Sequence, residues 1–115
     1  MVNPQFIEES PLGIVQIKSM LKSMEKRDID MNYRSNKAKE FIDFFGSALG
    51  AAKSEDLMKK LSSLSITRLK PVHIIKIIDF LPRDLDELRI IMTSYTVSLP
   101  KKDQEAIVAA VKEFL

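Results

Sequence analysis

Residues 69–91 read LKPVHIIKIIDFLPRDLDELRII, and this stretch predicts two helices joined by a sharp corner. Pro71 suits the first turn of a helix because its φ is fixed near the helical value and its missing N–H would have no partner there. Pro82 ends that helix, since the residue before a proline is disfavoured in the α region. Asp84 then caps a second helix, with Glu87 three residues on in the capping-box position. The two helices should therefore meet at this corner.

Both helices carry the apolar pattern of a protein core. The first is apolar around most of its circumference, so we expect it to be buried on more than one side. The second repeats apolar side chains at spacings of three and four, which indicates one buried face. These apolar residues are Val72, Ile74, Ile75, Ile77, Ile78 and Leu81 in the first helix, and Leu85, Leu88, Met92 and Tyr95 in the second.

The composition is that of one soluble globular domain, or of one small domain with an arm. The chain has 115 residues, of which 45% are hydrophobic and 30% charged. The absence of cysteine excludes disulfides and thiolate metal sites. The opening residues lack a signal-peptide pattern, and no run of about 18 apolar residues occurs, so a cytoplasmic location is expected. The net charge is only +2 and no basic tail exists, which argues against phosphate binding as the main activity.

The N-terminal half starts with a short apolar segment at residues 6–10, which is followed by Pro11. The segment is too short for a stable helix and suits one strand. No second strand is evident in the sequence, so a strand here would need a partner for its backbone groups. Two readings stay open: the segment pairs with another protein by β-augmentation, or it is a frayed terminus.

Helical periodicity governs the rest of the chain. Stretches 12–24 and 33–48 each predict a helix with an apolar face, and the second should stop near Leu49 because Gly46 and Gly50 flank its end. Ser54 is expected to cap a third helix and Pro100 to open the last one. The apolar faces comprise Ile14, Ile17, Leu21 and Met24, then Ala38, Phe41, Ile42, Phe45 and Leu49, then Leu57, Leu61 and Leu64, and finally Ile107, Val108, Val111, Phe114 and Leu115.

Residues 69–88 also resemble the F-type stalk subunit of archaeal RNA polymerase, the smaller half of the stalk heterodimer. The resemblance is a long ungapped run that is strong over the C-terminal half of the chain. The N-terminal half is similar only in its size and in having a short apolar start followed by helices. The matching features are Leu69-Lys70-Pro71, Lys76-Ile77-Ile78-Asp79, Leu81-Pro82 and Asp84-Leu85-Asp86-Glu87-Leu88-Arg89.

The resemblance implies a non-catalytic stalk subunit of an archaeal-type DNA-directed RNA polymerase. Such a protein forms an obligate heterodimer with the larger, E-type stalk subunit, joins the polymerase core through it, supports transcription initiation and guides nascent RNA. The expected fold is all-α: residues 1–65 form a partner-binding arm with a short strand and helices, and residues 66–115 form a small HRDC-like helical domain. No cofactor, metal, membrane or small-molecule substrate is expected.

Site residues follow from this resemblance together with the apolar surface, which exceeds what 115 residues easily bury. Phe44 lies off the apolar face of its helix, so that helix is either sandwiched within the chain or presents Phe44 to a partner. Contact with the E-type subunit is expected at Phe6, Ile7, Ile14, Ile17, Phe41 and Phe44, with Leu81 and Pro82 packing nearby, and weak RNA contact at Arg68, Lys70 and Arg83.

Few residues suggest catalysis. His73 is the only histidine, and its expected place is a helix edge with its ring partly in water. The acidic residues Asp84, Asp86 and Glu87 lack the spacing of a calcium loop, and a helix N-terminus explains them without a metal. No glycine-rich phosphate loop occurs.

Two alternatives from other classes remain. The chain could be a free-standing HRDC-type nucleic-acid-binding module, since Arg68, Lys70, Lys76, Arg83 and Arg89 could form a basic edge. Nearby acidic residues cancel much of that charge. It could also be a helical homodimer that uses the same apolar faces. The sequence does not decide which face is internal and which meets a partner, or whether the chain folds alone.

Overall fold

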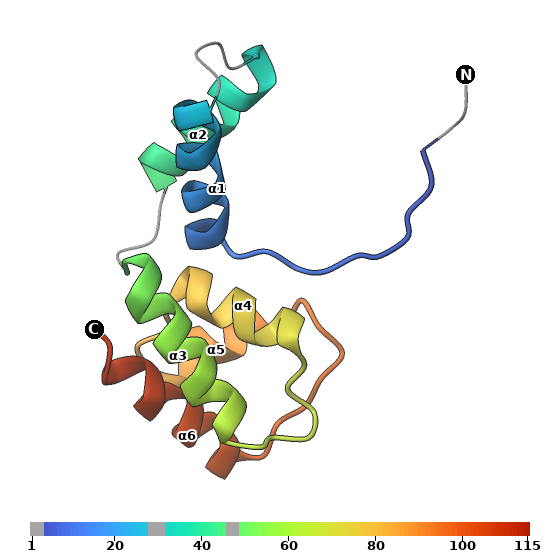
Figure 1. Cartoon of the computed structure of the whole chain (residues 1–115). Helices are drawn as coiled ribbons and strands as arrows, with labels where there is room; N and C mark the ends of the chain where they lie inside the picture. Colours follow the sequence, from blue (N-terminus) through green and yellow to red (C-terminus); the bar gives the residue numbers. More distant parts are fainter. Residues whose placement is uncertain (1–3, 28–31, 46–48) are drawn as a thin grey trace.

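Six helices follow one another in the computed structural model, which describes residues 4–27, 32–45 and 49–115 (Figure 1). The helices are α1 (Ile14–Arg27), α2 (Tyr33–Phe45), α3 (Ala51–Ser63), α4 (Pro71–Phe80), α5 (Leu85–Met92) and α6 (Lys101–Lys112). The described residues contain no strand, so the expected all-α class is confirmed. Residues 6–10, where a short strand was expected, form neither helix nor strand in the isolated chain, and the same holds for the rest of residues 4–13.

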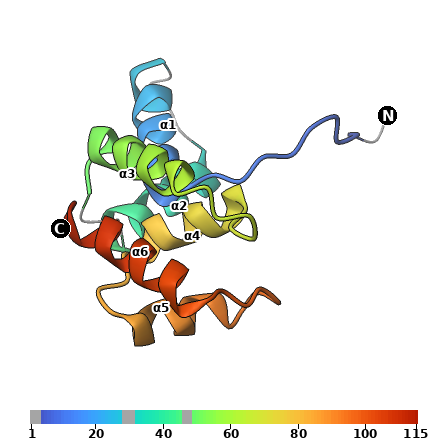
Figure 2. The ribbon, with the colours of Figure 1, turned by 90° about the horizontal axis from the view of Figure 1, so that it is seen from below.

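The helices are arranged as a hairpin above a four-helix body. In Figure 1, α1 and α2 lie side by side at the top, and α3 to α6 pack together below them. Within the body, α3 contacts α4 and α6, and α5 contacts the same two helices. Figure 2 shows the same body from below, with the N-terminal arm extending away from it. The hairpin joins the body through contacts between α1 and α3.

The core lies inside the four-helix body. Its most deeply buried side chains are leucines of α3, isoleucines of α4 and the apolar face of α6, so the faces expected from the sequence meet one another. The core cluster comprises Leu49, Leu57, Leu61, Leu69, Ile74, Ile77, Ile78, Leu81, Leu88, Met92, Leu99, Ile107, Val108, Ala110 and Val111. Val15, Leu21 and Ile42 are the buried apolar side chains of the described hairpin.

The corner between α4 and α5 forms as the sequence predicts. Pro71 stands in the first turn of α4, which ends at Phe80. Leu81 follows with a positive φ of 50°, and its N–H donates to the carbonyl of Ile77 at 2.7 Å. Asp84 is the N-cap of α5, where its side chain accepts from the backbone N–H of Glu87 at 2.8 Å. The chain thus reverses within four residues.

Helix α3 starts earlier than the sequence prediction. Ser54 was expected to be its N-cap, but the helix begins at Ala51 and its N-cap is Gly50. Ser54 lies one turn inside and is buried, and its backbone N–H donates to the carbonyl of Gly50 at 3.0 Å. The earlier start has a local cause, because alanine and lysine are strong helix formers and extend the helix towards its N-terminus.

The apolar face expected for residues 33–48 is only partly buried. Ile42 is buried, whereas Ala38 and Phe41 are exposed. Helix α2 ends at Phe45, and the stop expected near Gly46 falls outside the described residues. Helix α2 therefore turns much of its apolar surface away from the core.

Candidate partner-binding surface

The N-terminal arm carries the most exposed apolar side chains of the described chain. Residues 4–13 run outward from the start of α1 and away from the body (Figure 1). Phe6 is 88% exposed and Ile7 is 99% exposed. Burial of such a side chain would stabilise a complex by about 1.5–3 kcal/mol. The arm therefore offers strong apolar anchors to a partner.

The base of the arm is held in place by a residue from the far half of the sequence. Gly13 is the N-cap of α1, because its carbonyl accepts from the N–H of Ile17 at 3.1 Å. Its own N–H donates to Gln16 Oε1 at 2.8 Å. The next N–H, that of Ile14, donates to Oδ1 of Asp79 in α4 at 2.9 Å. Asp79 thus supplies the side-chain cap that a glycine lacks.

Glycine at this position permits the close approach of α1 and α4. A Cβ atom on Gly13 would lie 3.3 Å from Asp79 Oδ1 and 3.5 Å from Cγ2 of Ile75. Half-burial of Asp79 raises the pKa of its carboxyl group, while the hydrogen bond from Ile14 and the charge of Lys76 partly oppose that rise. The start of α1, from which the arm departs, is therefore fixed by a packed, partly desolvated contact.

The α1–α2 hairpin adds a second group of apolar side chains. Ile14 and Ile17 are half-buried on α1, whereas Phe41 is 56% exposed and Phe44 is 82% exposed on α2. An ion pair between Glu25 of α1 and Lys39 of α2 joins the two helices. The hydrogen bond and the charge of Glu25 raise the pKa of Lys39.

The corner residues Leu81 and Pro82 lie inside the chain rather than on its surface. Leu81 belongs to the core cluster and Pro82 is fully buried. Any effect of these two residues on partner binding would be indirect, through the shape of the corner. The surface of the corner is formed by Phe80 and Ile90, which are 62% and 71% exposed and line an open hollow of about 280 Å³.

Phe80 and Ile90 were not among the partner-binding residues predicted from the sequence. The only signal was that Ile90 lies off the face defined by Leu85, Leu88 and Met92, as Phe44 lies off the face of its own helix. Apolar residues off the main face of a helix are often isolated surface positions. The sequence pattern therefore does not distinguish an isolated exposed side chain from one that contacts a partner.

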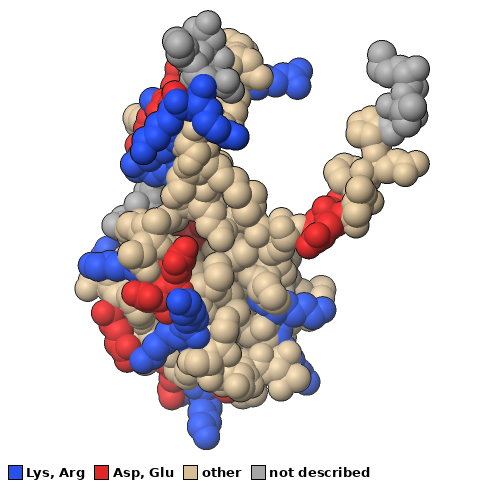
Figure 3. All heavy atoms as spheres, viewed as in Figure 1, with Lys and Arg blue, Asp and Glu red and all other residues tan. Residues whose placement is uncertain are grey.

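The three basic residues expected to contact RNA flank opposite ends of α4. Arg68 and Lys70 precede the helix, and Arg83 follows it. A ten-residue helix is about 15 Å long, so the three exposed side chains do not form one cluster. Arg68 donates from Nη1 to the carbonyl of Ser98 at 3.1 Å. In Figure 3, basic side chains gather on the α1–α2 hairpin.

His73 is buried, which corrects the expected position with its ring partly in water. It is 4% exposed, and its Nδ1 accepts from the backbone N–H of Lys70 at 3.0 Å. Its ring packs edge-on against the ring of Tyr95, with 4.6 Å between the ring centroids. The physical reason is that α4 is covered on several sides, so a polar residue among its isoleucines is enclosed with them. In this structure, His73 provides the hydrogen-bond acceptor for the Lys70 N–H at the start of α4.

The acidic residues after the corner are engaged as a helix start. Glu87 Oε2 accepts from the backbone N–H of Arg83 at 2.7 Å, which complements the cap made by Asp84. Across residues 4–27, 32–45 and 49–115, histidine and acidic side chains nowhere gather in a group of three that could hold a metal ion. None of the helices described here has the length and apolar character needed to cross a membrane.

The fold and its surface define a small all-helical protein that carries apolar side chains on an extended arm and on a helical hairpin, outside its core. The family model described as RNA polymerase Rpb4 matches residues 5–115. The chain therefore belongs to the RNA polymerase Rpb4 family, and the resemblance to F-type stalk subunits is confirmed. No curated protein is similar enough to this chain to count as a match.

Proposed function

We propose that the chain is the non-catalytic stalk subunit of an archaeal-type DNA-directed RNA polymerase and forms an obligate heterodimer with the larger, E-type stalk subunit in the cytoplasm. The observation that carries the proposal is the family match, which covers the arm, the hairpin and the body together. The exposure of Phe6, Ile7 and Phe44 supports it, because obligate interfaces are large and apolar.

The arm is proposed to form its strand only on the partner. Residues 4–13 are extended away from the body, and the described residues offer no strand that could pair with them. Addition to the edge of a partner's sheet would satisfy their backbone groups, while Phe6 and Ile7, as adjacent residues of a strand, would point to its two opposite faces.

The hairpin is proposed to contribute the second half of the interface. Phe41 and Phe44 are exposed on α2, and Ile14 and Ile17 are half-buried on α1. We propose that residues 1–65 form the partner-binding part of the chain and that residues 66–115 form its HRDC-like part. Within the stalk, the chain is proposed to join the polymerase core through the E-type subunit, to support initiation and to guide nascent RNA.

The test of the interface is a double charge substitution, Phe6→Asp with Phe44→Asp, in the chain co-purified with the E-type subunit. Loss of two apolar anchors should weaken the heterodimer by about a hundredfold or more. The matched control is Thr67→Asp with Thr96→Asp, which adds the same charge at two exposed positions of the body. Light scattering and a binding titration give the masses and the Kd.

Two outcomes would contradict the proposal. A double variant that binds the E-type subunit as tightly as the unchanged chain would show that Phe6 and Phe44 lie outside the interface. A chain that forms a stable homodimer alone and stays homodimeric when the E-type subunit is present would favour the homodimer alternative.

RNA contact is tested separately on the heterodimer. Arg68, Lys70 and Arg83 are exposed, as RNA-binding side chains must be. If they touch phosphates, RNA affinity should fall with salt, and each substitution by alanine should reduce the slope of that dependence by about one. An unchanged slope in all three variants would remove them from the RNA path, and steep salt-dependent binding by the isolated chain would favour the free-standing module.

A further inference from the structure

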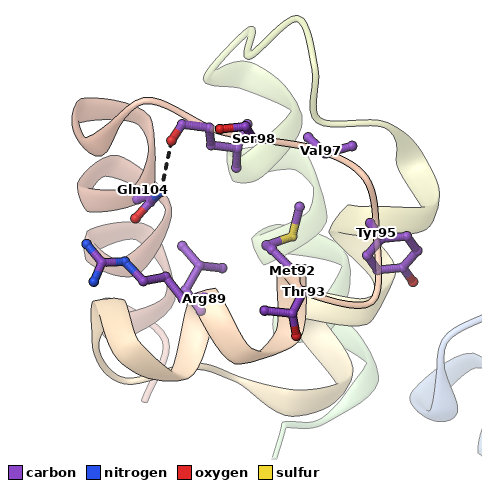
Figure 4. Close-up of a pocket in the computed structure, with 9 residues that line it drawn as sticks. Arg89, Met92, Thr93, Tyr95, Val97, Ser98 and Gln104 are labelled. Atoms are coloured by element: carbon purple, nitrogen blue, oxygen red, sulfur yellow. Dashed lines mark hydrogen bonds between the residues drawn. The ribbon is translucent and has the colours of Figure 1, made fainter.

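The body contains a hollow of about 410 Å³ between α5, α6 and the connector that joins these two helices. Figure 4 shows its walls: α6 on the left, α5 below, and the connector of residues 93–100 curving around the other side. Its volume falls in the range of ligand-binding clefts. It shares no residue with the surface predicted for the E-type subunit, so it offers a second and independent binding surface.

The floor of the hollow is apolar. Met92 and Leu99 are each 7% exposed and belong to the core cluster, and Val97 packs against that cluster. A large apolar side chain that entered the hollow would therefore contact atoms that are already fixed by core packing. Anchors of this kind contribute most to binding when they fill a preformed pocket.

One buried polar atom in the wall of the hollow, an oxygen of Gln104, lacks a hydrogen-bond donor among the described residues. Gln104 of α6 donates from Nε2 to the carbonyl of Leu99 at 2.8 Å, which fixes the orientation of its amide (Figure 4). Its Oε1 is buried and has no hydrogen-bond partner within the described part of the chain. A buried acceptor without a donor costs about 1–3 kcal/mol. Because Oε1 has almost no accessible surface, an incoming N–H group removes that cost only after the Gln104 side chain shifts toward the hollow.

The charge at the rim is positive. Arg89 is the charged side chain among the described residues that line the hollow, and it lies on the same side as Gln104 (Figure 4). Its contact with Asp86 is long, at 3.7 Å, and both side chains are exposed, so this ion pair contributes little. Arg68 adds a second guanidinium at the carbonyl of Ser98 on the rim. The rim therefore complements a carboxylate.

We propose that this hollow binds a short acidic peptide segment of another protein, with a large apolar side chain on Met92 and Leu99, a backbone N–H on Gln104 Oε1 and a carboxylate on Arg89. A peptide supplies these three groups at short spacing. Nucleic acid fits less well, because phosphate binding relies on several clustered cations and the floor of this hollow is apolar. The stalk body would then recruit a partner at a place separate from the E-type subunit.

The test uses the full chain labelled with ¹⁵N and two peptide probes, SDEFLDES and SKKFLKKS. We expect the acidic peptide to bind and the basic peptide to bind at least about tenfold more weakly, because like charges at an interface repel. The largest chemical-shift changes should fall on residues 92–99 and on the side-chain amide of Gln104.

Two variants separate recognition from folding. Arg89→Glu should weaken the acidic peptide at least about tenfold, whereas Lys112→Glu, an equal charge change at an exposed position outside the hollow, should leave its affinity unchanged. Gln104→Leu should weaken the peptide, and because it also removes the hydrogen bond to the Leu99 carbonyl, the free energy of unfolding of the variant is measured beside its affinity. A purely structural role for Gln104 would lower the stability and leave the peptide affinity of the folded chain unchanged.

Several results would overturn the proposal. These are equal binding of both peptides, shift changes located on the arm or hairpin, equal losses for Lys112→Glu and Arg89→Glu, or a peptide affinity unaffected by Gln104→Leu. An oligouridine probe that shifts the same resonances more strongly than the acidic peptide would assign the hollow to RNA.

Discussion

Asp79 Oδ1 of α4 lies 2.9 Å from the backbone nitrogen of Ile14, a residue 65 positions earlier in the chain. Through this hydrogen bond a helix of the body caps the first helix of the hairpin, and it does so at the point where the arm departs. The start of α1 and the packing of the body are therefore coupled through one carboxylate. Changes at Asp79 should be felt in both.

Substitution of Asp79 separates its roles as a hydrogen-bond acceptor and as a charge. Asp79→Ala should lower the free energy of unfolding by about 1 kcal/mol, as the loss of a helix cap does. Asp79→Asn keeps an acceptor for the Ile14 N–H and should cost far less. Urea unfolding followed by circular dichroism measures both, since the chain has no tryptophan to report by fluorescence.

The same pair of variants reports the pH dependence. Because burial raises the pKa of Asp79, the folded state holds this proton more tightly than the unfolded state. Its contribution to stability is present below the ordinary aspartate pKa and is lost as pH rises through the folded-state pKa. Relative to the unchanged chain, Asp79→Asn should therefore gain stability over this acidic range as pH increases. A difference that is constant with pH would refute the raised pKa.

Gly13 is predicted to be required for space rather than for backbone conformation. Gly13→Ala would place a Cβ atom 3.3 Å from Asp79 Oδ1, a crowded distance, and should lower the free energy of unfolding by about 1–3 kcal/mol. Gly50→Ala is the matched control, since Gly50 is the N-cap of α3 and a Cβ atom there meets nothing within 4 Å.

The difference between the two alanine variants isolates the crowding. If both variants cost the same free energy in chemical unfolding, the loss belongs to the cap position and the close approach of α1 to α4 is unimportant. Combining Gly13→Ala with Asp79→Ala should give less than the sum of the two single losses, because the second change removes the atom that the new Cβ meets.

The corner between α4 and α5 was predictable because each signal acts within a few residues. Pro71 and Pro82 fix their own φ and remove their own N–H, and Asp84 needs only the N–H of Glu87 three positions on. None of these effects depends on what packs against the corner. Local chemistry of this kind can be read directly from the sequence.

Other features depend on contacts between distant positions and were not predictable. The link from Asp79 to Ile14 joins two helices whose adjacency no periodicity reveals. The burial of His73 depends on which sides of an all-round apolar helix are covered, and its contact with Tyr95 comes from the connector after α5. The start of α3 was misplaced because Ser54 is a strong cap signal, yet the residues before it form helix equally well.

His73 is predicted to stabilise the chain by accepting the Lys70 N–H at the start of α4. His73→Leu fills similar space but leaves that N–H without its acceptor, so it should lower the free energy of unfolding by about 1–3 kcal/mol. His73→Gln is the matched control, because a glutamine at the third helical position can reach back to the same N–H. Thermal and urea unfolding of the two variants give the comparison, and equal losses would mean that packing against Tyr95 dominates.

Ser65 is predicted to be a site where glycine stabilises the chain. It follows the C-cap of α3, is exposed, and has a positive φ of 54°, a conformation that costs an L-residue about 1–2 kcal/mol. Ser65→Gly removes that cost and adds some entropy to the unfolded state, so a net gain of about 0.5–1 kcal/mol in the free energy of unfolding is expected.

Two further glycine substitutions provide a comparison for the stability gain expected at Ser65. Ser63→Gly, inside the last turn of α3, should destabilise the chain by about 1 kcal/mol, because glycine there costs backbone entropy and removes the hydrogen bond from Ser63 Oγ to the Lys60 carbonyl. Leu81 shares the positive φ, at 50°, but its side chain is buried in the core. Leu81→Gly should therefore lose about 2–5 kcal/mol despite the relieved backbone. If Ser65→Gly proved as destabilising as Ser63→Gly, the left-handed conformation after α3 would carry no strain.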